Sequence, residues 1–489
     1  MLIARAFLAI ALIVFLSGCS TIFDARSQKE KIIASYKAGN FAESAALVEK
    51  KADAREGTGD ELMWRLEEGS AFFSAGDYVK SIKAFEKAEK IILDYENRAV
   101  VTVRDGKDET ASMLTNPNAI PYKGNYHEKI MLNAYKALCY FALGKAEDAR
   151  VELRRMYERQ KEAMERFGDE IEKAENFAKK NNSSMENISS KVTEFKEIEK
   201  SVTPVSNKAL GNFANPFATY LSAIGYLSDG SYDSAAVDFR NLYRMDPKNT
   251  LFRKDLITCA MRSSENIPRE LALELPEKYS MTSNVVYVIF ANGMAATRKG
   301  ITIHLLLPPP VTGYTGVSFP ILEYFPKPYD CVSLRDSAGN TFRTVRVADM
   351  DAIIAREYKN ALPAMITRIF LAIAVKETAN FFLLQAAKND AAVYWATVAA
   401  MSAYKYAFNT PDTRCWQMLP KEYQIVHFPK PPDGKITVTP GFQGILPHLG
   451  SGDTANAKEI TLNNEKKISI IYVNSPGKGV FSVSLFEFN

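Results

Sequence analysis

Cys19 is the residue of this sequence whose chemistry is clearest, because its thiol follows a stretch typical of an exported chain. Arg5 gives the N-terminus a positive charge, and an uncharged apolar stretch runs from 6 to 16. Small Ser17 and Gly18 then precede the cysteine, where an export signal is normally cleaved. The apolar stretch is too short to cross a bilayer as a helix. The pattern therefore predicts a signal peptide over residues 1–18 that ends at a thiol.

The run Leu16-Ser17-Gly18-Cys19 resembles the lipobox of bacterial lipoproteins. This resemblance implies a diacylglyceryl thioether on Cys19, cleavage before it and acylation of the new amino group. Several acyl chains would anchor the protein firmly, at roughly 0.8 kcal/mol per buried CH2 group. Ser20 follows and not Asp, which in Gram-negative sorting favours the outer membrane, on its periplasmic face. The alternative is an ordinary signal peptide with an incidental cysteine.

The other reactive residues form no known catalytic or metal-binding pattern. The sequence contains no G-x-S-x-G, G-x-x-x-x-G-K-[ST] or H-E-x-x-H motif and no dinucleotide fingerprint, so we expect no enzymatic activity and no cofactor. The four histidines lack the spacing of a helical metal pair, so we expect no metal site. Four further cysteines show no C-x-x-C spacing, so buried free thiols are expected, with a Cys331–Cys415 disulfide as the alternative.

Charge and length narrow the class of protein further. The chain has 489 residues and a formal net charge of +4, and its basic residues are interspersed with acidic ones. This distribution lacks the basic patch of a nucleic-acid-binding protein. The length is sufficient for two or three domains.

The first half of the chain, residues 19–265, has the pattern of paired helices. Four glycine-centred turns, at Gly39, Gly76, Gly144 and Gly230, each lie between two stretches of helical apolar periodicity. Around the second turn, small and aromatic residues fall at the spacings of a tetratricopeptide (TPR) unit, and the fourth turn matches as well. Glycine permits the left-handed turn between two helices. We therefore predict an N-terminal TPR-like α-solenoid.

Two long interruptions separate these repeats. Residues 153–202 carry a seven-residue apolar repeat among Lys and Glu, which predicts a projecting, coiled helical arm folded back at residues 181–184. The two limbs of this arm could pair with each other, or the arm could bind another protein or a second copy of the chain. The loop 104–125 ends in Tyr122 and leads into Tyr126, and long loops in compact domains are often functional.

The inner helices of the predicted solenoid are apolar nearly all round. An open groove of this kind would be a large exposed hydrophobic patch, so we expect it to be covered, either by the loop 104–125 or by the C-terminal domain. The candidate groove or partner-binding residues are Tyr122, Tyr126, Tyr135, Leu138, Phe141, Tyr220 and Ile224.

The second half, residues 280–489, has the period of β-strands. Short runs rich in β-branched and aromatic residues are separated by Pro, Gly and Asn clusters, which predicts a β-sandwich-like domain. Residues 351–409 instead predict a helical insertion of two or three helices, packed on a neighbour or, alternatively, lying at a membrane surface. Asp412, Arg414 and Trp416 close this insertion and suit a structural corner with a salt bridge and an aromatic plug.

Four features together resemble a family of bacterial TPR-containing outer-membrane lipoproteins without an assigned activity. They are the lipobox, the run 128–155 with Tyr135-Lys136-Ala137-Leu138 and Ala149-Arg150-Val151-Glu152, the stretch Asn215-Pro216-Phe217, and the segment 412–420. The resemblance implies a cell-envelope setting, because relatives are associated with genes for lipoprotein activators of penicillin-binding proteins. It supplies no catalytic residue.

We therefore expect an α+β, multidomain, membrane-anchored scaffold or adaptor that binds another cell-envelope protein, in the assembly of peptidoglycan or of surface machinery. A homo-oligomer formed through the helical arm is a second expectation. The alternative function is an accessory protein that binds an apolar ligand in the TPR groove.

Overall fold

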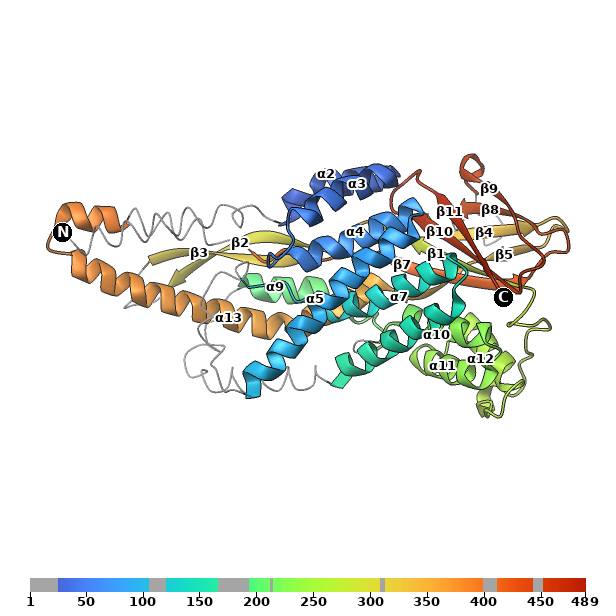
Figure 1. The fold of residues 1–489 in the computed structure, drawn as a ribbon. Coiled ribbons are helices and arrows are strands. Elements are labelled where there is room, and N and C mark those ends of the chain that lie inside the picture. Colours follow the sequence, from blue (N-terminus) through green and yellow to red (C-terminus); the bar gives the residue numbers. More distant parts are fainter. Residues whose placement is uncertain are drawn as a thin grey trace.

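The computed structural model describes residues 25–104, 120–165, 193–211, 214–307, 313–398, 411–442 and 452–489. The fold mixes helices and sheets, as the α+β prediction requires. Figure 1 shows the N-terminal helices lying over one side of the strands and a long helix, α13, running out beyond them. Cys19 and the signal peptide lie outside the described residues.

The first half of the chain is built from successive helices joined by short turns. The helices are α2 (Ala25–Lys37), α3 (Phe41–Asp53), α4 (Glu61–Ala75), α5 (Tyr78–Arg104), α7 (Tyr126–Ala142), a helix over residues 146–165, α9 (Thr193–Ser206), α10 (Pro216–Ser228), α11 (Tyr232–Met245) and α12 (Thr250–Ala260).

The predicted glycine turns are confirmed, since Gly39, Gly76, Gly144 and Gly230 all have positive φ angles. Neighbouring helices approach closely where a glycine faces a large side chain. A Cβ atom on Gly69 of α4 would lie 2.5 Å from two ring carbons of Phe85 on α5.

The strands of the second half form three sheets within the described residues. The largest sheet has the order β11-β10-β1-β7-β6, in which β1 pairs with β10 in parallel and the other neighbours are antiparallel. The other two are a β2–β3 hairpin and a sheet of order β5-β4-β8-β9. The strands are β1 (Val285–Asn292), β2 (Thr297–Leu307), β3 (Gly313–Glu323), β4 (Cys331–Asp336), β5 (Thr341–Arg343), β6 (Val345–Asp349), β7 (Glu422–Pro429), β8 (Lys435–Gly441), β9 (Lys458–Thr461), β10 (Ile468–Ser475) and β11 (Ser482–Phe488).

The central sheet, β11-β10-β1-β7-β6, is buried on both faces, and its side chains alternate between two cores. Along β1, Tyr287 and Ile289 belong to a core shared with the helices, whereas Val286 and Val288 belong to a core shared with β4 and β8. This alternation follows from the period of two in a β-strand. The central sheet therefore has helices on one face and the β5-β4-β8-β9 sheet on the other.

The helical and β-rich segments share one continuous hydrophobic core, which extends from Ile32 to Phe488. Within it, α7 packs against β11 and α10 packs against β6. The two units expected from the sequence, residues 19–265 and 280–489, are therefore joined by apolar packing rather than by a linker alone.

The projecting element is different from the predicted one. The middle of the expected arm, residues 166–192, lies outside the described residues. Its last part forms α9, which packs on α13 and places Phe195 against Phe319 of β3, with ring centroids 5.2 Å apart. The apolar face of α9 therefore packs on the insertion and on the β2–β3 hairpin. The predicted pairing of the arm's two limbs involves residues outside the described part of the chain.

The expected helical insertion begins with a single helix, α13 (Met350–Ala387), and a second helix covers residues 391–398. The first turns of α13 are buried, through Ala352, Ala355 and Tyr358, but Figure 1 shows the helix continuing beyond the sheets. The base of the insertion packs on the body as expected, through residues up to Met365 and Ile366. The expectation for residues 399–410 lies outside the described part of the chain. In the described part of the chain, no helix combines the length and apolar character needed to span a membrane.

Replacing Gly69 by Ala should lower the free energy of unfolding by about 1–3 kcal/mol, because the new methyl group overlaps the Phe85 ring. Phe85→Leu also costs stability, but it should make the glycine substitution cheaper. Chemical denaturation of both single variants and the double variant checks this. Strict additivity of the two losses would show that the two residues do not pack as described.

Candidate functional site

The predicted corner at Asp412, Arg414 and Trp416 lies at the junction of the helices with the central sheet. The Arg414 guanidinium donates to both Asp412 carboxylate oxygens, at 2.8 and 3.0 Å, and to Asp60 at 3.1 Å. Its Nη1 also donates to the carbonyl oxygen of Ile120 at 2.8 Å. Burial would raise the pKa of Asp412, but the bonds from Arg414 outweigh it and hold that pKa below its usual range.

Carboxylates from the helices bind the backbone that follows Arg414. Glu67 of α4 accepts hydrogen bonds from the backbone N–H groups of Gln417 and Met418, at 2.7 and 3.1 Å. Glu128 of α7 accepts from the backbone N–H of Trp416 at 2.7 Å. These N–H groups lie just before β7, where no neighbouring strand could accept from them, and an unpaired buried N–H is costly.

Lys29 of α2 completes this arrangement. Its ammonium donates to Glu67 Oε1 at 2.5 Å and to the carbonyl oxygen of Cys415 at 2.7 Å. Both charged side chains of the Lys29–Glu67 pair are 1% exposed. A buried pair is retained only where further hydrogen bonds satisfy it, and here both partners also bind the segment 415–418. These side chains therefore form a polar clamp, in which Lys29, Glu67 and Glu128 hold the segment 415–418, just before β7, against the first helices.

The loop-end tyrosines belong to the same clamp. Tyr122 is buried, donates to Glu128 Oε2 at 2.6 Å and lies with its ring 5.5 Å from the Arg414 guanidinium. The backbone N–H of Tyr126 donates to Glu357 of α13 at 2.8 Å. The structure therefore brings together two sets of residues that the sequence suggested separately, and it makes Tyr122 inaccessible to a partner.

The five predicted groove residues are all covered by the chain itself. Tyr135, Leu138, Phe141, Tyr220 and Ile224 are at most 3% exposed. Trp416 packs on Tyr135, with ring centroids 5.5 Å apart, and Phe488 of β11 stacks on Phe141 at 4.8 Å. The expectation that the C-terminal segment covers the apolar helices is confirmed, and the structure leaves no open groove at these residues.

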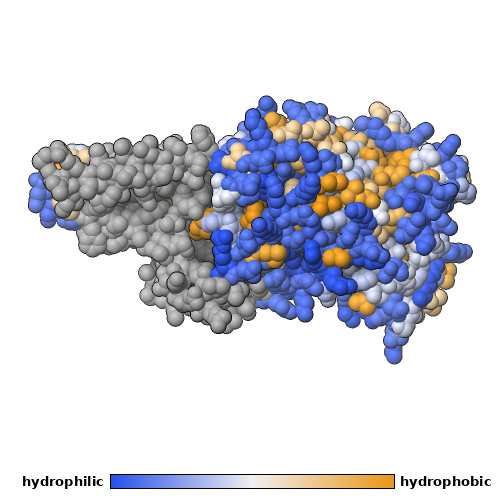
Figure 2. Space-filling view, in the orientation of Figure 1, coloured by the Kyte–Doolittle hydropathy of each residue, from blue (hydrophilic) through white to orange (hydrophobic). Residues whose placement is uncertain are grey.

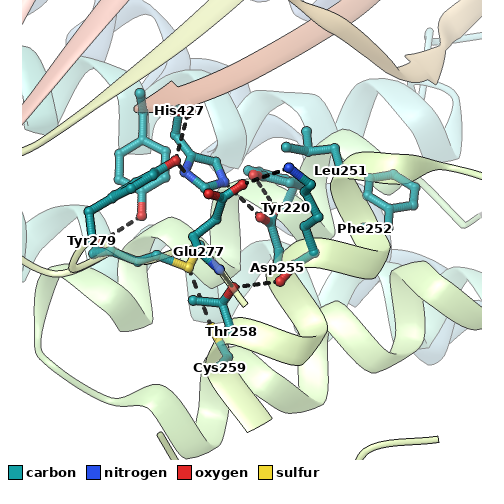
Figure 3. Close-up of polar contacts among 12 residues, drawn as sticks. Tyr220, Leu251, Phe252, Asp255, Thr258, Cys259, Glu277, Tyr279 and His427 are labelled. Atoms are coloured by element: carbon teal, nitrogen blue, oxygen red, sulfur yellow. Dashed lines mark hydrogen bonds and ion pairs between the residues drawn. The ribbon is translucent and has the colours of Figure 1, made fainter. Parts of the chain in front are cut away.

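A buried polar network that the sequence did not reveal links α10 and α12 to β7 (Figure 3). His427 Nε2 lies 2.6 Å from Asp255 Oδ1, and the Tyr220 hydroxyl donates to Asp255 Oδ2 at 2.5 Å. The Tyr279 hydroxyl lies 2.9 Å from His427 Nδ1. Burial and the adjacent Asp255 charge raise the pKa of Tyr220.

Asp255, His427 and Tyr279 are hydrogen-bonded in a chain, and an aspartate, a histidine and a hydroxyl in this order are the components of a catalytic triad. Catalysis additionally requires that substrate reach these groups. Asp255 and Tyr220 are 0% exposed and His427 is 5% exposed, and only Tyr279, at the outer end of the network, is half-buried. The geometry therefore favours a structural role, in which one buried carboxylate joins two helices to a strand.

The described cysteines and acidic residues give no second centre. Cys139, Cys259, Cys331 and Cys415 are buried free thiols, as expected, so the alternative Cys331–Cys415 disulfide does not form. Burial raises the pKa of Cys415 to about 11. Within the described ranges, no group of three or more His, Cys, Asp or Glu side chains could hold a metal ion.

One accessible hollow lies on the helical side, between helices and not at the predicted groove residues. Side chains of α5, α7 and the helix 146–165 line a groove of about 450 Å³, with Lys136 and Tyr140 from α7. Lys136 pairs with Glu89 at 2.8 Å and with Glu152 at 2.9 Å. The apolar side chains Leu93 and Val151 also line this groove.

Comparison with known proteins adds no relative. No model of a protein family matches the chain, and no curated protein matches it.

His127 of α7 forms an ion pair with Glu357 of α13, and this pair makes the stability of the fold depend on pH. Burial alone would lower the pKa of His127, but the Glu357 carboxylate, 2.7 Å from Nδ1, outweighs it and raises that pKa. A histidine with a raised pKa stabilises the fold below its unfolded pKa of about 6.5, and this contribution is lost as pH rises through the folded pKa. We therefore expect the free energy of unfolding to fall from pH 6 to pH 8 more steeply in the native protein than in His127→Gln.

Denaturant titrations at several pH values measure this slope. Glu357→Gln should flatten the slope as well, because it removes the charge that raises the histidine pKa. An unchanged slope in both variants would exclude the pair as its source.

Proposed function

We propose that this chain is a lipid-anchored adaptor of the bacterial cell envelope, in which TPR-like helix pairs packed on a β-sandwich-like body present an outer surface to another envelope protein. The observation that carries the proposal is the closure of the inner helical face. Trp416, Tyr423 and Phe488 occupy the side of the helices where a peptide or apolar ligand would otherwise bind. The buried polar groups are equally sealed, which speaks against catalysis.

The outer helical face offers the features of a protein-binding surface. Leu93 of α5 and Val151 of the helix 146–165 both line the groove described above and are 47% and 51% exposed. Figure 2 shows hydrophobic side chains separated by hydrophilic ones over the face that carries α4, α5 and α7. A set of apolar contacts within a charged surround is the composition of a non-obligate interface.

The lipid anchor supports the envelope setting. Cys19 follows a lipobox-like run and lies six positions before Ala25, where α2 begins. This spacing would keep the body within about 20 Å of the bilayer, at about 3.3–3.6 Å per residue. An anchor this short suits an adaptor that meets membrane proteins or peptidoglycan near the surface.

Cys19→Ser should move the protein from the membrane fraction to the soluble fraction, because a serine hydroxyl cannot accept the thioether lipid. Fractionation of cells and metabolic labelling with a palmitate analogue measure this, with Cys139→Ser as the matched control because Cys139 is a buried thiol far from the N-terminus. Unchanged membrane association and labelling of Cys19→Ser would refute the anchor.

A photo-crosslinking amino acid at Leu93, which lines the same groove as Val151, should capture one envelope protein in intact cells. Val151→Asp should reduce the yield of the crosslinked complex about tenfold, because it places a charge in a desolvated contact. A tenfold loss corresponds to about 1.4 kcal/mol of binding free energy. The same crosslinker at Lys200 on α9, whose side chain is 79% exposed, serves as the control position. Equal capture at both positions, or no capture from either, would contradict a binding surface on the outer helices.

A further inference from the structure

We infer that the projecting end of α13 and the turn that follows it lie on the phospholipid surface to which the chain is anchored. This inference rests on the proposed lipid anchor and adds a second membrane contact, made by protein side chains rather than by acyl chains. The contact surface consists of the turn 388–390 and the exposed residues of the helix 391–398, and it is called the arm tip below.

The reach of the arm follows from contacts at its base. The Tyr358 hydroxyl on α13 donates to the carbonyl oxygen of Pro320 on β3 at 2.7 Å. Three residues further along β3, Glu323 pairs with Arg26 in the first turn of α2. The start of α2 and position 358 of α13 therefore lie near the same stretch of β3.

From Tyr358 to Ala387, α13 continues for 29 residues, or about 44 Å at 1.5 Å per residue. The tether from Cys19 to Ala25 spans at most about 20 Å. Figure 1 shows α13 running away from the sheets on the side where α2 begins. The part of α13 beyond Tyr358, about 44 Å long, is longer than the tether of about 20 Å. The arm tip therefore reaches the bilayer when α13 inclines toward the membrane.

The composition of the arm fits an apolar surface better than water. Residues 361–398 contain three basic and two acidic residues in 38, whereas 24% of the whole chain is charged. Asp390, one of the two acids, accepts hydrogen bonds from the backbone N–H groups of Ala392 and Val393 at 3.0 and 3.1 Å, so its charge caps the second helix. The Asp390 carboxylate is therefore partly satisfied by the backbone of the helix that it caps, although the side chain is exposed.

The side chains at the arm tip are those of a membrane–water interface. Trp395 is 66% exposed and packs edge-on against Tyr394, with ring centroids 5.6 Å apart. Tryptophan and tyrosine favour the headgroup level, because their rings are apolar and their N–H or O–H groups hydrogen-bond to water. Exposed Lys388 lies in the adjacent turn, where it can meet anionic headgroups.

The three tryptophans of the chain allow a direct test. Trp64 is 1% and Trp416 is 2% exposed, so Trp395 is the tryptophan that a lipid-borne quencher can reach. The lipidated full-length protein is reconstituted into phosphatidylethanolamine–phosphatidylglycerol vesicles with and without brominated acyl chains. We expect brominated lipid to quench the Trp395 component, and Trp395→Phe to abolish this quenching.

Flotation of the same vesicles separates this inference from the proposed anchor. Protein that floats without any quenching keeps the anchor and overturns the arm contact, whereas quenching of unlipidated Cys19→Ser protein at high lipid concentration supports the arm contact independently. Trp395→Glu should weaken vesicle binding of Cys19→Ser protein about tenfold, a change of about 1.4 kcal/mol.

Leu273→Glu is the matched control, because Leu273 is 97% exposed and lies outside the arm, so it should leave vesicle binding unchanged. Acrylamide quenching of Trp395 is also measured without vesicles, at increasing protein concentration. If Trp395 becomes shielded as the concentration rises, the tip contacts a second copy of the chain and the inferred lipid contact is wrong.

Discussion

Coverage of the apolar inner helices is the constraint on which the rest of this structure depends. Helices α4, α7 and α10 are buried on nearly every side, and a helix that is apolar all round is stable only where something covers it. The cover is the central sheet, whose helix-facing side chains continue the same core. Because that sheet must also bury its opposite face, the β5-β4-β8-β9 sheet becomes necessary as a third layer.

Apolar packing of this kind fixes the layers but not their register, and buried polar groups supply the register. The carboxylates of Glu67 and Glu128 bind the backbone N–H groups of residues 416–418. Further along the chain, in β7, Asp255 binds His427. Each carboxylate would be left buried and unsatisfied if β7 shifted by one residue, at a cost of about 1–3 kcal/mol or more. The polar contacts therefore make one alignment of helices and sheet much more favourable than its neighbours.

The sequence predicted the parts of the fold that local pattern controls. The glycine turns, the apolar inner helices and most strands follow from periodicity and turn residues, which act within a few positions. Residues 341–347 form two short strands, β5 and β6, which separate at Thr344, whose hydroxyl bonds to Val332 and Gln424. That exchange depends on residues far along the chain.

The contacts that join distant segments were much harder to predict. Along β7, His427 shares a face with Tyr423 and Ile425, so alternation alone places a histidine against the helices. Its partner Asp255 lies 172 residues earlier, and nothing local marks the two as neighbours. The packing of α9 on α13 and of Phe195 on Phe319 likewise joins segments more than 100 residues apart, and no local pattern marks them as neighbours.

The same filling of the interior determines where this protein can act. Trp416, which precedes β7, and Phe488 of β11 pack on the apolar helices, so the side of the helices on which a groove was predicted is part of the stabilising core. Binding through that side would require separation of the helices from the sheet and loss of the core. Recognition without unfolding therefore requires a surface outside this core, and the proposed surfaces on the outer helices and at the arm tip meet that requirement. This division favours an adaptor whose rigid interior holds two separate exposed surfaces at a fixed distance.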